Sequence, residues 1–115
     1  MPIGSIILKW DERSGINILA KNPEDVVDII SKKSLLQLYN MHQYLTEEGV
    51  VWLNLDTLNI VSYFSGIDFY FVLVLNMLEN PEDFEEKTRN CGKKLLDYLD
   101  SENLDEIMTN LCEDL

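Results

Sequence analysis

Three apolar runs joined by three-residue links constrain the fold more than any other feature of this sequence. The runs are Val50 to Leu55, Asn59 to Ser65 and Phe69 to Leu75, and the links are Asp56-Thr57-Leu58 and Gly66-Ile67-Asp68. Links this short can join only neighbouring antiparallel strands. The sequence therefore predicts a β-meander.

The last of these runs, Phe69 to Leu75, shows no alternation of polar and apolar residues. A strand with one face in water alternates, whereas a strand covered on both faces is apolar throughout. We therefore expect this strand to be central, with helices on each side of the sheet.

A β-hairpin is predicted near the start of the chain. Ile6 to Trp10 is a β-prone run, Asp11 to Gly15 has the composition of a turn with Gly15 free to take a positive φ, and Ile16 to Lys21 alternates like an edge strand.

Three helices complete the predicted elements. The first runs from Ser31 or Ser34 to Tyr44 and is apolar over more than one stripe, so that it either lies deep in the domain or contacts a partner. The second begins at Asn80-Pro81 and carries an inner stripe of Phe84, Thr88, Cys91, Leu95 and Tyr98, and the last begins at Asn103. The predicted class is α+β, in a single domain over residues 1–115.

The net charge of −12 argues against nucleic acid and anionic membranes as partners, because both attract Lys and Arg. The charge is uneven, since residues 59–115 carry thirteen Asp or Glu and four Lys or Arg. This excess of negative charge either attracts a basic partner or keeps the surface of the helices solvated.

The location that we expect is the cytoplasm. No apolar run approaches the length of about 20 residues that spans a bilayer, and the N-terminus does not resemble a signal peptide. Cys91 and Cys112 form neither a CxxC pair nor a disulfide framework, so we expect reduced, apolar packing groups.

The motifs of the common catalytic sites are absent from the sequence. There is no phosphate-binding glycine loop, nucleophile elbow, HExxH or EF-hand loop, and the spacing of His42, Cys91 and Cys112 fits no common zinc motif. His42, the single histidine, lies among apolar residues and is expected to pack rather than to act as a base. We expect a non-enzyme that uses no cofactor and no metal.

The order of elements resembles that of longin-like domains of the longin/roadblock superfamily, particularly archaeal ones. The residues that carry the resemblance are the opening hairpin Ile6 to Gly15, the meander segment Leu58 to Gly66 and the acidic helix pair at the end. A roadblock domain would begin with an additional helix, so the longin type is the closer match.

The resemblance implies a five-stranded antiparallel sheet in the order 2-1-5-4-3, with one helix on one face and two on the other, a profilin-like architecture. It also implies a non-catalytic platform for small-GTPase regulation or membrane traffic. Its partner would be a small GTPase or another longin/roadblock domain, and it would often be a dimer. The sequence shows no heptad SNARE segment after the domain.

The residues expected at a protein interface lie on the third strand and the first helix. They are Val51, Trp52 and Leu53 on the strand, and Tyr39, Met41, His42 and Tyr44 on the helix. An edge strand offers unpaired backbone groups, and the helix adds apolar and aromatic area. The alternative for Trp52 and Tyr39 is packing inside the monomer.

A second hypothesis for the function is an acidic inhibitor or mimic that occupies a basic site on another protein. Its binding would weaken steeply with ionic strength, whereas apolar edge pairing would change little.

Overall fold

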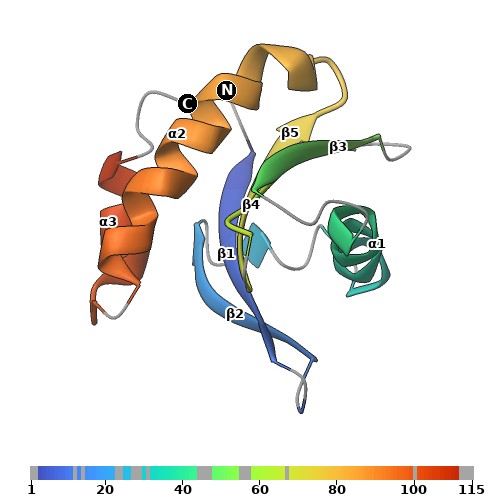
Figure 1. Ribbon diagram of the computed structural model, residues 1–115. Helices are drawn as coiled ribbons and strands as arrows, with labels where there is room; N and C mark the ends of the chain where they lie inside the picture. Colours follow the sequence, from blue (N-terminus) through green and yellow to red (C-terminus); the bar gives the residue numbers. More distant parts are fainter. Residues whose placement is uncertain are drawn as a thin grey trace.

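The first and last strands of the chain lie side by side in the centre of one sheet (Figure 1). The computed structural model describes residues 3–11, 13, 15–22, 25, 26, 30, 32–43, 48–54, 58–66, 68–99 and 101–111. The strands are β1 (Gly4–Asp11), β2 (Gly15–Asn22), β3 (Gly49–Asn54), β4 (Leu58–Phe64) and β5 (Phe69–Asn76). They form a five-stranded sheet in the order β2-β1-β5-β4-β3, with every neighbouring pair antiparallel. The predicted sheet order is confirmed.

The helices form a layer on each face of the sheet, which confirms the predicted α+β architecture. Helix α1 (Lys32–Gln43) covers one face, and α2 (Glu85–Leu95) and α3 (Leu104–Leu111) cover the other (Figure 1). Two short 3-10 helices, η2 (Pro81–Phe84) and η3 (Leu96–Tyr98), flank α2. None of the helices in the described part of the chain is long and apolar enough to cross a membrane.

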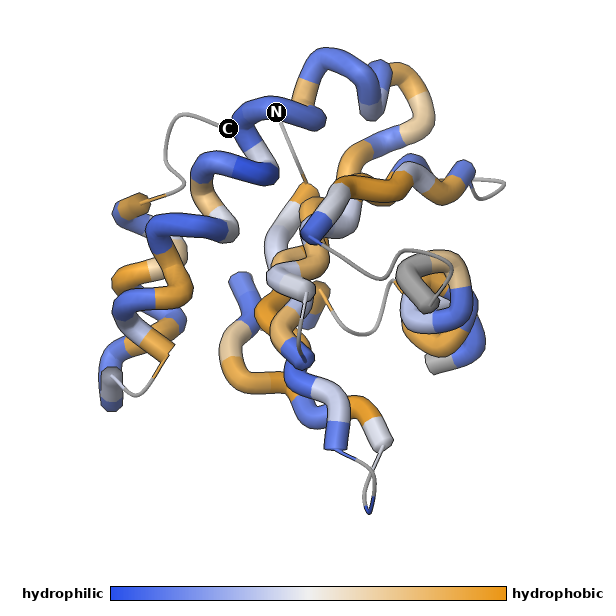
Figure 2. Tube along the Cα trace, viewed as in Figure 1, coloured by the Kyte–Doolittle hydropathy of each residue, from blue (hydrophilic) through white to orange (hydrophobic). Residues whose placement is uncertain are grey.

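Both faces of β5 are buried, as its uniform apolarity predicts, since all residues from Phe69 to Leu75 are buried. Leu8 and Val72 meet the α1 residues Leu35 and Leu38 on one face. On the other face, Ile7 and Phe71 of the strands pack in one cluster with residues of α2 and α3. Most of α2 is hydrophilic, as its colour in Figure 2 shows. The continuous burial of β5 joins the two layers into one domain core.

Two predicted local features are confirmed at the ends of elements. Gly15 takes a φ of +81° at the hairpin turn, a conformation that L residues rarely adopt. Asn80 caps η2, where its side chain accepts a hydrogen bond from the Glu82 N–H. Pro81 follows at the first helical position, where its missing N–H costs nothing.

Two expectations for the second helix are wrong. Tyr98 is exposed rather than part of the inner stripe, because the chain changes from α to 3-10 geometry after Leu95, and Leu96 and Tyr98 then lie on the outside. Cys91 is buried as expected, yet it is disulfide-bonded and not a free thiol. The chain's other cysteine, Cys112, lies outside the described residues.

Candidate functional site

The two edges of the sheet, β2 and β3, differ in regularity. The pairing of β2 with β1 shifts register between Ile7 and Leu8, so that Leu19 is an extra, bulged residue. The pairing of β3 with β4 continues without a shift from Gly49 to Asn54. Among the described residues no strand pairs with the outer side of β3. Strand β3 is therefore the regularly paired, open edge of the sheet.

Trp52 is the exposed aromatic side chain of this edge. Successive side chains of a strand alternate between faces, and Leu53 packs into the core on the α1 side. Trp52 therefore points to the α2 side, where its partner in register is the buried Val61. Its side chain remains 41% exposed, although a tryptophan of the core would be covered.

A turn with two exposed apolar side chains lies beside the end of β3. Met77 and Leu78 follow β5 and are 62% and 90% exposed. The Asn59 side chain donates hydrogen bonds to the carbonyls of Met77 and Glu79 at 3.4 and 2.9 Å. Because Asn59 pairs with Asn54, the turn is held next to the last residue of β3.

The Asn76 side chain fixes the conformation of the same turn. Its Oδ1 accepts hydrogen bonds from the N–H groups of Leu78 and Glu79 at 2.8 and 3.1 Å. The exposure of Met77 and Leu78 is thus a property of an ordered turn. We call the set of Trp52, Met77 and Leu78 the β3 apolar surface. Two of its three members lie outside the predicted elements, and no periodicity in the sequence indicates them.

The predicted interface residues on the first helix divide between the core and an undescribed part of the chain. The Tyr39 ring stacks on Trp10 with centroids 3.9 Å apart, and Tyr39 and Met41 are half-buried against the core. The side chain of His42 and the whole of Tyr44 lie outside the described residues. As contact residues, all of these remain predictions.

The predicted residues of the third strand are brought together, but only one of them is mainly exposed. Val51 is half-buried against the core and Leu53 is buried, whereas Trp52 is exposed. A partner that pairs with β3 would therefore meet the backbone of all three residues and chiefly the side chain of Trp52.

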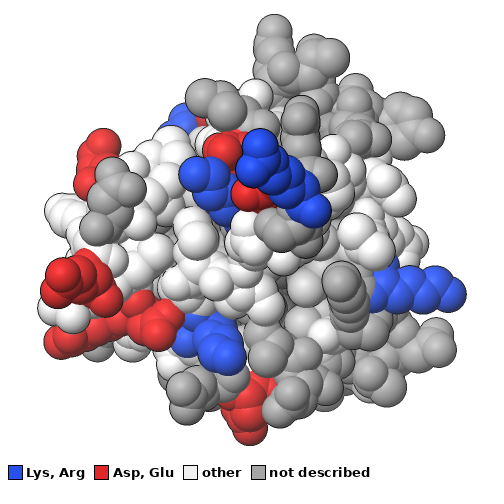
Figure 3. All heavy atoms as spheres, turned by 90° about the horizontal axis from the view of Figure 1, so that it is seen from below, with Lys and Arg blue, Asp and Glu red and all other residues white. Residues whose placement is uncertain are grey.

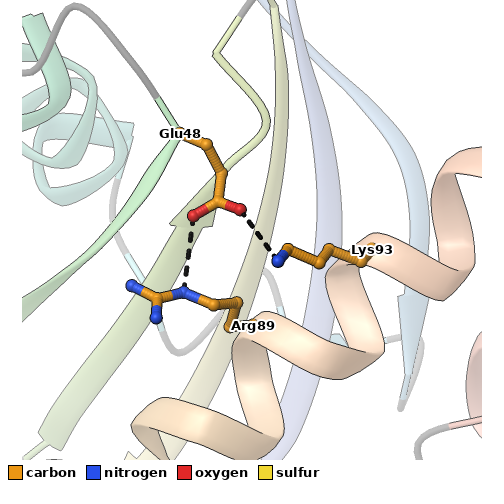
Figure 4. A network of polar contacts seen from close by, with 3 residues as sticks. All are labelled: Glu48, Arg89 and Lys93. Carbon is orange, nitrogen blue, oxygen red and sulfur yellow. Dashed lines mark ion pairs between the residues drawn. The ribbon is translucent and has the colours of Figure 1, made fainter.

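A polar network joins the start of β3 to α2 (Figure 4). The Glu48 carboxylate lies 3.4 Å from Arg89 Nε and 3.3 Å from Lys93 Nζ. The buried Tyr63 hydroxyl donates to the same carboxylate, and burial together with the charge of Glu48 raises the Tyr63 pKa. The network thus links the residue that precedes β3 to the second helix.

A groove lies between the β2 end of the sheet and the 3-10 helix η3. Its volume is ≈ 270 Å³, and its lining residues are Lys9, Leu19, Asp68, Phe69, Leu96 and Leu99. Lys9 and Asp68 form an exposed ion pair of 3.9 Å there. Within the described part of the chain no group of three or more metal-ligating side chains is found. The groove offers apolar contact and one ion pair, without a nucleophile and base in contact.

Comparison of the sequence with protein-family models and with curated proteins found no match.

Proposed function

We propose that the protein is a non-catalytic interaction module that pairs through β3 with a second copy of itself or with a related domain. The observation that carries the proposal is the exposed Trp52 on an edge strand whose pairing has no bulge. An edge strand presents N–H and C=O groups that another strand can pair, and long flat edges are otherwise protected in monomers.

A second copy is the simplest partner for this edge. Two β3 strands that pair antiparallel are related by a two-fold axis, so that each copy uses the same surface and the assembly closes at two chains. The β3 apolar surface then adds side-chain contact to the backbone pairing, and Trp52 is a residue type that commonly anchors interfaces.

The resemblance to longin-like domains adds the cellular context of the proposal. It favours small-GTPase regulation or membrane traffic as the process, and a small GTPase or a longin/roadblock domain as a further partner. On this proposal the exposed flank of α1, beside Tyr39 and Met41, borders the interface, and the protein works in the cytoplasm. Reduced cysteines no longer support a cytoplasmic location, because Cys91 is disulfide-bonded.

The test compares two single variants by light scattering coupled to size exclusion. Trp52→Glu places a charge on the β3 edge, and Ile18→Glu is its matched control on β2, since the two side chains are 41% and 42% exposed. We expect Trp52→Glu to convert a dimer to a monomer and Ile18→Glu to leave the dimer intact. Equal masses for wild type and Trp52→Glu would contradict the proposal.

The distribution of charge favours a second function, that of an acidic inhibitor or mimic. Exposed carboxylates gather on the side of the molecule where α3 lies (Figure 3). They include Asp97, Glu102, Asp105 and Glu106. In a pull-down from lysate, partners held by this surface would be lost between about 0.05 and about 0.5 M salt, whereas partners held by β3 would remain.

A further inference from the structure

On the outer side of strand β2, one backbone N–H group forms a hydrogen bond with a side chain of α3. The Lys21 N–H donates a hydrogen bond of 2.9 Å to Asp105 Oδ1, a contact between positions 84 apart in sequence. Asp105 lies in the first turn of α3, whose Leu104 and Met108 pack in one core cluster with Ala20 of β2. The helix is thus anchored by apolar contact where it brings the carboxylate to the edge.

The Asp105 carboxylate takes the place of a carbonyl oxygen from a neighbouring strand. A strand that paired with the outer side of β2 would have to place a carbonyl oxygen at the Lys21 N–H, because paired strands exchange N–H and C=O hydrogen bonds along their length. With Asp105 in place, the Lys21 N–H is already bonded, and the carboxylate repels the carbonyl oxygens of an incoming strand. The bulge at Leu19 interrupts the row of backbone groups a few residues away.

Closing only one edge determines the kind of assembly that can form. A pair of β3 strands leaves two β2 edges at the outside of a continuous sheet, and β2 pairing there would add further copies without limit. We propose that Asp105 is a specificity-determining residue that closes the β2 edge and limits self-association to β3. That β3 is the edge left open for pairing is taken from the proposed function, on which this inference rests.

The test uses Trp52→Glu as the background, so that β3 pairing does not obscure the result. Asp105→Ala removes the acceptor. Glu106→Ala is the matched control, because both residues are exposed acids in the first turn of α3. Asp105→Asn keeps an acceptor oxygen and shows whether the hydrogen bond, rather than the charge, is needed. The readouts are the exchange rate of the Lys21 amide by NMR and the mass by light scattering over a concentration series.

We expect Asp105→Ala to accelerate exchange at Lys21 by about tenfold or more, because a hydrogen bond to a charged group corresponds to about a tenfold to a hundredfold change in an equilibrium constant. We also expect it to produce concentration-dependent self-association that Glu106→Ala and Asp105→Asn lack. Unchanged exchange, or faster exchange at an unchanged mass, would overturn the inference.

The same experiment distinguishes failure of this inference from failure of the proposed function. If Trp52→Glu alone has the mass of the wild type, the proposal for β3 fails. A gain in mass on adding Asp105→Ala still supports the role of Asp105, because it is measured within one background.

Discussion

Gly92 sets the distance between α2 and the sheet. A Cβ at this position would overlap the ring of the buried Tyr63, and the ring is held at its hydroxyl by Glu48. Alanine gains up to about 1 kcal/mol over glycine in a helix, but overpacking a core costs about 1 to 3 kcal/mol. We therefore expect Gly92→Ala to lower the free energy of unfolding by about 1 to 2 kcal/mol.

Urea unfolding measures this change, and Asn90→Ala is the control. Asn90 is exposed on α2, so that its replacement by alanine gains helix propensity without a clash and leaves stability equal or slightly higher. An increase in stability for Gly92→Ala would show that the Tyr63 ring can move away.

Two buried tyrosines make stability depend on pH in the alkaline range. Burial raises the pKa of Tyr63 and of Tyr70 above the ordinary value of 10.0. The folded state therefore holds the phenolic protons more tightly than the unfolded state. The protonated tyrosines contribute fully to the free energy of unfolding below pH 10.0, and this contribution is lost as the pH rises above that value toward the raised pKa of the folded state.

We expect Tyr70→Phe to reduce the loss of stability between about pH 8 and about pH 11 in denaturant titrations. Tyr98→Phe is the control, because it removes the same hydroxyl from an exposed tyrosine outside the core. The explanation fails if both variants lose stability over this range as steeply as the wild type.

At the scale of elements, the disulfide at Cys91 constrains the second helix. The sequence has one other cysteine, Cys112, so the untreated protein should contain no free thiol when it is unfolded without reductant. A crosslink reduces the entropy of the unfolded chain, and removing one costs about 2 to 4 kcal/mol. Reductant should lower the urea midpoint of the wild type and leave that of a Cys91→Ser/Cys112→Ser variant unchanged. Two reactive thiols in the untreated protein would contradict this prediction.

The elements themselves follow from local signals in the sequence. The short links of the meander determine its pairing, and the apolar run Phe69 to Leu75 indicates a central strand, which β5 is. The resemblance to longin-like domains supplied the order of the whole sheet, including the neighbours β1 and β5, which are distant in sequence.

The details that distinguish the two edges could not be predicted in this way. The bulge at Leu19 lies within an alternating run, and the bond from Lys21 to Asp105 depends on where α3 packs. Tyr39 was expected at an interface or in the monomer core, and its stack on Trp10 joins two elements that no local pattern relates. The turn at Met77 and Leu78 is held by hydrogen bonds that the Asn59 side chain donates and the Asn76 side chain accepts, and no local sequence pattern indicates these contacts.

At the scale of the whole molecule, the negative charge and the apolar edge make opposite predictions about salt. A net charge of −12 on each chain opposes self-association at low ionic strength, and salt screens this repulsion. Pairing through β3 should therefore be equally strong or stronger at about 0.5 M salt than at about 0.05 M. Sedimentation equilibrium at both concentrations measures this, and a dimer that dissociates in high salt would point to ionic contacts instead.

Backbone pairing of β3 is tested most directly by hydrogen exchange at increasing protein concentration, with single-residue resolution. In a β3-paired dimer, the amide groups of Gly49–Asn54 that do not bond to β4 become protected as the dimer forms, whereas those of β2 keep the same exchange rates at every concentration. This pattern is the result that we predict. Exchange in β3 that stays fast and independent of concentration while the protein self-associates would contradict it.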